Sequence, residues 1–163
     1  VLDQGHKRLG YVGGPESSGP TRRRLAGFRD AITSRDLAID ESLITYGDFT
    51  FQSGLQAGAR LLAAKSDLTA IICANDAMAA GVIHAVRENG MRVPDNISVT
   101  GFDDSELAQQ VWPPLTSVAQ PVREMALEAS RILIQALTRG DDDTPSKREF
   151  AHLFRTFFSS LSI

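Results

Sequence analysis

The sequence predicts an α/β protein whose core is a parallel sheet built from βαβ units. Short β-like runs alternate along the chain with helical patterns of about 10–15 residues. The run 70–74 is apolar throughout, which is typical of a strand covered on both faces. The length of 163 residues corresponds to about one domain.

Five strands and four helices are expected in order. The strands are predicted at 8–13, 42–46, 70–74, 97–102 and 115–119. The helices are predicted at 22–35, 51–64, 75–89 and 122–138, with a short helix or a loop at 104–110. Apolar stripes at helical spacing support each helix. The stripes are Leu25, Phe28 and Ile32; Phe51, Leu55, Ala59 and Leu62; Ala79, Val82, Ile83 and Val86; and Val122, Met125, Ala126, Ala129, Ile132, Leu133 and Leu137.

The last part of the chain has a different pattern. Helical spacing relates Phe150, Leu153, Phe154, Phe157, Phe158 and Leu161. This periodicity predicts an amphipathic helix. We favour a terminal helix docked on the core over a partner-binding or dimer-forming helix, and over a membrane-surface helix.

Composition and charge exclude several classes of protein. The net charge of −3 provides no overall basic surface for nucleic acid, and no apolar run approaches the ~18 residues of a membrane span. A single cysteine, Cys73, excludes an internal disulfide framework. Because the first residue is Val1 and not Met, we expect the sequence to be part of a longer product.

Polar or aromatic groups follow each predicted strand, where ligands bind in open α/β sheets. The candidate ligand-binding residues are Arg24, Phe49, Asn75, Asp103 and Gln120. Carboxylate, guanidinium and amide groups suit the hydroxyls of a sugar, and an aromatic face can cover its C–H side.

Other residues near these strand ends have simpler interpretations. Asn75 also fits a helix N-cap, and Asp48 fits a cap or turn residue. Arg22 and Arg23 are expected on the surface. Asp76 and Asp104 are expected to support the site or to interact with a helix dipole.

Catalytic and nucleotide-binding sites have little support. Pro20 stands where a Walker A loop needs lysine, and no G-x-G-x-x-G or G-x-S-x-G motif occurs. The three histidines are scattered, and Cys73 lies inside an apolar strand. A magnesium-dependent or acid/base cluster of Asp48, Asp76, Asp103 and Asp104 is the enzymatic alternative. We therefore predict a protein that is not an enzyme and needs no cofactor or metal.

An ordered set of segments resembles the LacI/GalR family of bacterial transcription regulators. The segments are GHKR (5–8), RLAGF (24–28), GDF (47–49), TAIICANDAMA (69–79), RVPDNISVTGFDD (92–104), PPLTSV (113–118) and QP (120–121). The resemblance implies the C-terminal part of an effector-binding domain of the type I periplasmic-binding-protein fold. By motif, Arg24, Phe49, Asn75 and Asp103 match effector contacts, and Gln120 matches the subdomain hinge.

The resemblance also divides the chain and implies its partners. Residues 1–120 match the C-terminal effector-binding subdomain, and 121–140 match a helix that packs on an N-terminal subdomain absent here. Residues 141–163 form a divergent tail that lacks the family's usual final strand.

The implied partners are a sugar, sugar phosphate or nucleobase effector and operator DNA, which would be bound only through a missing N-terminal domain. The implied state is a cytoplasmic homodimer with no membrane contact, and the small apolar helix at 77–86 is either the dimer face or core. The alternative is a periplasmic sugar-binding protein of a transport or sensing system, and a metal-dependent hydrolase remains the enzymatic rival.

Overall fold

The computed structural model describes residues 1–64, 67–139 and 148–155. The strands are β1 (Leu9–Gly13), β2 (Ile44–Tyr46), β3 (Ala70–Cys73), β4 (Ser98–Asp103), β5 (Thr116–Ala119) and β6 (Leu153–Arg155). The helices are α1 (Gly19–Thr33), α2 (Phe51–Ala63), α3 (Asp76–Glu88), α4 (Glu106–Gln110) and α5 (Val122–Arg139), with 3₁₀ turns η1 (Leu2–Gln4) and η2 (Glu41–Leu43).

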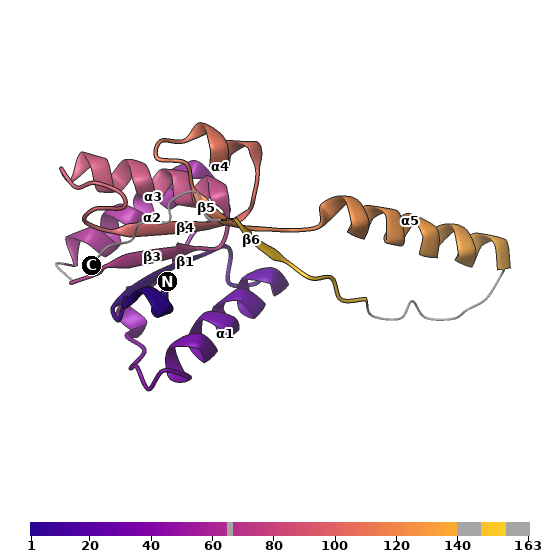
Figure 1. The fold of residues 1–163 in the computed structure, drawn as a ribbon, viewed down its shortest axis with the longest axis horizontal. Coiled ribbons are helices and arrows are strands. Elements are labelled where there is room, and N and C mark those ends of the chain that lie inside the picture. The colour runs from indigo at the N-terminus through magenta and orange to yellow at the C-terminus, as the bar shows by residue number, and fades with distance from the viewer. Residues whose placement is uncertain (65–66, 140–147, 156–163) are drawn as a thin grey trace.

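The described strands form one sheet in the order β2-β1-β3-β4-β5-β6. Strands β1 to β5 all pair in parallel, while β6 pairs antiparallel with β5. Helices α2 and α3 cover one face of the sheet, and α1 lies on the other (Figure 1). The predicted α/β class with a parallel sheet is therefore confirmed, with one antiparallel edge strand added.

Glycines control how closely α2 and α3 approach. A Cβ atom at Gly54 would lie 2.2 Å from the carbonyl oxygen of Met78, and one at Gly81 would lie 2.1 Å from that of Phe51. The predicted stripe of α2 is only partly correct: Leu55 and Leu62 are half-buried, but the spacing of large apolar residues does not detect the small residues that contact α3. The buried face consists of Gly54, Ala57, Gly58 and Leu61, whereas Phe51 and Ala59 are exposed.

The apolar stripe predicted for α3 is correct. Ala79, Val82, Ile83 and Val86 are all buried. In the segment 77–86, all residues except Ala77 and His84 are buried, and Ala77 is half-buried. Of the two interpretations left open for this helix, the structure therefore supports core.

Two predicted boundaries move for local reasons. Helix α1 begins at Gly19, three residues before its predicted start, because Pro20 occupies its first turn, where proline loses no helical hydrogen bond. The predicted strand 42–46 starts later, since the Asp40 side chain accepts hydrogen bonds from Ser42 and stabilises the turn η2.

The amphipathic helix predicted near the C-terminus is wrong at residues 153–155. These residues form β6, because the free edge of β5 offers backbone hydrogen-bonding groups to them. The expectation that the tail lacks a final strand is also wrong there. Phe150 lies outside any helix, and Phe157, Phe158 and Leu161 lie outside the described residues.

Helix α5 projects away from the rest of the molecule (Figure 1). Its predicted apolar stripe is consequently not covered: Leu133 is 61% exposed and Leu137 is 77% exposed. Within the described residues, no helix combines the length and the apolar character needed to cross a membrane.

Substituting Gly54 by alanine is expected to destabilise the fold by about 1–3 kcal/mol, because the new methyl group meets the Met78 backbone. Gly27→Ala in α1 is the matched control. Its Cβ has no atom within 4 Å, so it should stabilise the helix by about 0.5–1 kcal/mol. Urea unfolding measures both, and equal stabilities of the two variants would contradict the close-packing argument.

Candidate ligand-binding site

The parallel strands bring the five predicted residues to one edge of the sheet. Phe49, Asn75, Asp103 and Gln120 follow or end successive strands, and Arg24 lies in the helix that follows β1. Among the described non-glycine residues, four have positive φ, and Phe49, Asp103 and Asp104 are three of them, at 69°, 113° and 53°. Backbone strain concentrated at one edge is typical of a functional site.

Arg24, Asp103 and Gln120 form one cluster. The Gln120 Nε2 donates to Asp103 Oδ1 at 2.6 Å, and Arg24 Nη2 lies 3.8 Å from the same oxygen. Arg24 also donates to the carbonyl oxygen of Ala74 at 2.5 Å, and its guanidinium lies 3.8 Å from the centroid of the Phe102 ring. The guanidinium is thus oriented by three neighbours and keeps donors for a ligand.

Burial shifts the pKa of both charged members of this cluster. It raises the pKa of the Asp103 carboxyl, which the Gln120 hydrogen bond and the Arg24 charge oppose. It lowers the pKa of the Arg24 guanidinium, against the attraction of Asp103. Both groups are therefore partly removed from water before a ligand arrives, and the Asp103 side chain is still 37% exposed.

Phe49 and Asn75 form a second cluster beside the first. The Asn75 Nδ2 donates to the Phe49 carbonyl oxygen at 3.0 Å, while its Oδ1 accepts from the Met78 amide at the start of α3. The Phe49 ring lies against Gly14, where a Cβ atom would come within 2.1 Å of it. Asn75 therefore caps the helix and fixes the backbone that carries Phe49.

The structure assigns local contacts to the neighbouring residues. Asp48 accepts from the amide and hydroxyl of Thr50 and is a turn residue. Arg22 and Arg23 are exposed, as expected. Asp104 forms an ion pair with Arg155 at 2.9 Å, and Asp76 is buried among hydroxyl groups.

Sequence reasoning missed Phe102 and Arg155 at this edge. Phe102 precedes Asp103 in the motif GFDD, so its position next to the predicted site was visible in the sequence. Arg155 carried no such signal, because it reaches the edge only through the unexpected strand β6.

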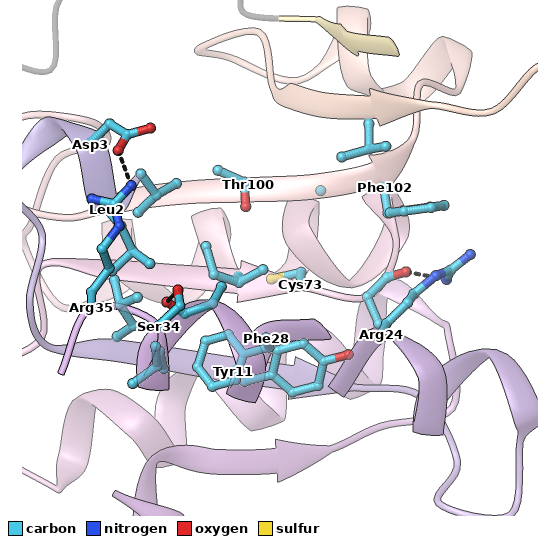
Figure 2. Close-up of a pocket in the computed structure, with 18 residues that line it drawn as sticks. Leu2, Asp3, Tyr11, Arg24, Phe28, Ser34, Arg35, Cys73, Thr100 and Phe102 are labelled. Atoms are coloured by element: carbon cyan, nitrogen blue, oxygen red, sulfur yellow. Dashed lines mark hydrogen bonds and ion pairs between the residues drawn. The ribbon is translucent and has the colours of Figure 1, made fainter. Parts of the chain in front are cut away.

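A cavity of about 500 Å³ lies on the α1 side of the sheet (Figure 2). It extends from Arg24 and Phe102 to Leu2 and Arg35, over Tyr11, Cys73 and Thr100. Burial raises the pKa of Tyr11 to about 12. Of the five predicted ligand-binding residues, only Arg24 lines this cavity, so the cavity adjoins the candidate site at Arg24 but does not contain the other four residues.

Groups suited to metal or nucleophilic chemistry do not gather in the part of the chain that the structure describes. No three histidine, cysteine, aspartate or glutamate side chains there are close enough to hold a metal ion. Cys73 is buried, and this burial raises the pKa of its thiol. Of the aspartates proposed as an enzymatic alternative, Asp48 lies in its own turn, whereas serine side chains connect Asp76 to the turn that contains Asp103 and Asp104.

Comparison with known proteins identifies the class. Residues 1–154 match the model of the periplasmic binding protein-like domain. The chain is 37% identical over 138 residues to the HTH-type transcriptional regulator CelR of Thermobifida fusca, and 38% identical over 137 residues to the HTH-type transcriptional repressor CytR of Escherichia coli. The chain therefore belongs to the LacI/GalR family of transcriptional regulators.

Solved structures agree with this assignment. A CelR–cellobiose complex superposes with a TM-score of 0.83 at 36% identity, covering 86% of this chain and 43% of that one. A lac repressor dimer bound to operator and the anti-inducer ONPF gives 0.80 at 34% identity, covering 88% and 49%. The chain spans 41% of CelR and 40% of CytR, or about two fifths of these curated relatives.

Asp103→Asn is expected to raise the melting temperature at pH 7. Because the pKa of Asp103 is raised in the folded state, the neutral carboxyl group stabilises the fold more than the ionised one does. This contribution to stability is complete below the ordinary pKa of 3.8 and is lost as the pH rises through the folded-state pKa. Asparagine keeps the neutral form at every pH and still accepts from Gln120. The melting difference from wild type should therefore close below about pH 3.8. Asp30→Asn, at an exposed position of α1, is the control, and a lower melting temperature of Asp103→Asn at pH 7 would contradict the interpretation.

Replacing Asn75 separates its two roles. Asn75→Ala removes the cap of α3 and should cost about 0.5–2 kcal/mol, whereas serine is nearly as good an N-cap as asparagine. Asn75→Ser should therefore retain most of the stability while losing the donor to Phe49. Guanidinium unfolding of both variants tests this, and an equal loss in the two would show that capping is not the stabilising role.

Proposed function

We propose that this chain is the effector-sensing part of a bacterial transcriptional regulator and that its ligand is sugar-like. The convergence of Arg24, Phe49, Asn75, Asp103 and Gln120 at one edge of the sheet carries the proposal. The set offers donors, acceptors and an aromatic ring in two neighbouring clusters, which suits a polyhydroxylated ligand. The cellobiose bound in the related CelR complex supports the same ligand class.

The proposal extends to partners and location. Operator DNA would be bound through a segment outside these 163 residues, in the cytoplasm, and the regulator would act as a homodimer. The related lac repressor dimer on its operator supports this assembly. CelR and CytR are transcriptional regulators, which favours a regulator over the alternative of a periplasmic sugar-binding protein. Neither of these two relatives is named as an enzyme.

The proposed mechanism is a shift between two conformations. A ligand that binds one conformation better shifts the population, and typical coupling energies of about 1–3 kcal/mol change the affinity at a distant site by about 5–150-fold. Asp103 and Gln120 are suited to transmit ligand binding. Asp103 is the last residue of β4, Gln120 lies just before α5, and a hydrogen bond joins them.

The protein at its natural length, bound to DNA selected from a random-sequence library, provides the test. Titration with cellobiose and other sugars should change DNA affinity by at least about fivefold for one of them. If no small molecule changes the affinity, the sensing role fails.

Arg24→Ala, compared with Arg23→Ala, tests the site itself. Both remove one positive charge from α1, but only Arg24 contacts Asp103 and Ala74. Losing a charged hydrogen bond of about 1.5–3 kcal/mol should weaken binding of the responsive sugar about 10–150-fold in Arg24→Ala, while Arg23→Ala stays close to wild type. Calorimetric titration measures both, and equal affinities would remove Arg24 from the site.

A further inference from the structure

Asp76 is a buried carboxylate next to the proposed site, and the proposed function does not use it. Its side chain is 1% exposed, and it accepts three hydrogen bonds. The amide and hydroxyl of Ser105 donate to Oδ2 at 2.7 and 2.9 Å, and the Ser117 hydroxyl donates to Oδ1 at 2.6 Å. All three donors are neutral groups, so the carboxylate is solvated by hydrogen bonds rather than by an ion pair.

The two serines that donate to Asp76 also contact or adjoin the strained turn at the end of β4. Ser105 follows Asp103 and Asp104, the two consecutive residues with positive φ. Ser117, on β5, also accepts a hydrogen bond from the Asp104 amide at 3.0 Å. The turn is thus connected to Asp76 directly through Ser105 and indirectly through Ser117.

Strand β4 packs closely against Asp76 at Gly101. A Cβ atom at Gly101 would lie 2.3 Å from Asp76 Oδ1, so β4 can approach the carboxylate only with glycine at this position. Two adjacent residues in the left-handed region are strained, and such strain persists only when neighbouring contacts hold it. The hydrogen bonds to Asp76 are among these contacts, together with those of Gln120 to Asp103 and of Arg155 to Asp104.

We infer that Asp76 is a positioning residue: through Ser105 and Ser117 it holds the Asp103–Asp104 turn, so that Asp103 faces Arg24 and Gln120. Asp76 does not contact the ligand. It acts by fixing the carboxylate that does, and this last step rests on the proposed function. As the first residue of α3, it also links the turn to the helix capped by Asn75.

Amide hydrogen exchange in the 163-residue chain tests, without any ligand, whether Asp76 holds the Asp103–Asp104 turn. Asp76→Asn and Ser117→Ala should each speed exchange at the amides of Asp104 and Ser105 by at least about tenfold. Ser98→Ala is the matched control, since Ser98 is another buried strand serine, bonded to His6 at the other end of the sheet. It should lower overall stability without affecting those two amides selectively.

Rescue distinguishes positioning from general loss of stability. Ser105→Ala should show part of the same effect, whereas Ser105→Thr keeps a hydroxyl for Asp76 and should restore slow exchange. If the Ser105 amide, which donates to Asp76 and not to Ser117, exchanges no faster in Ser117→Ala than in Ser98→Ala, the inference is wrong, even where Asp76→Asn fails to fold.

Binding of cellobiose to the protein at its natural length separates the two proposals. If wild type binds the sugar, Ser117→Ala should bind it about tenfold more weakly and Ser98→Ala about equally. If wild type does not bind it, the choice of cellobiose as ligand fails, while the exchange result still decides whether Asp76 holds the turn. Fast exchange with unchanged sugar affinity would show that Asp76 holds the turn but does not position Asp103 for the ligand.

Discussion

The parallel pairing of β1 to β5 is the constraint on which the rest of the molecule depends. Parallel strands direct all their carboxyl ends to the same edge, so residues separated by many positions in sequence become neighbours there. Arg24 and Asp103, or Asn75 and Phe49, meet only because of this arrangement. The helices contribute by covering both faces of the sheet, which a parallel sheet requires.

Residues at the same edge lower the stability of the fold. Phe49, Asp103 and Asp104 have left-handed backbone conformations, each costing on the order of 1–3 kcal/mol. Burial also works against the charged forms of Asp103 and Arg24. The close-packed contact of α2 with α3, and the buried strands β1 and β3, offset these costs away from the edge. A preorganised polar edge on a well-packed body is the expected arrangement for ligand binding.

The sequence was sufficient to predict the alternation of strands and helices and the position of the five candidate residues at one edge of the sheet, while their role in ligand binding stays a prediction. Both depend on local signals: short apolar runs, helical stripes, and the polar residues that follow each strand. The sequence-based predictions failed where the structure is decided by contacts between residues far apart in the sequence. The core face of α2 is set by Gly54 and Gly58 against α3, and glycine carries no hydrophobic signal. Residues 153–155 have helical spacing, but the free edge of β5 makes them a strand.

Helix α5 adjoins the candidate site at its N-terminal end. Gln120, just before the helix, donates to Asp103, and Arg155, in the strand after it, pairs with Asp104. Leu127 and Ile134 of this helix are more than half exposed, so the sheet does not cover these two side chains. Because Gln120 lies only two residues before the first residue of α5, a movement of α5 that displaces Gln120 must break its hydrogen bond to Asp103 or move the strained turn. The orientation of α5 and the geometry of the candidate site are therefore linked through the Asp103 carboxylate.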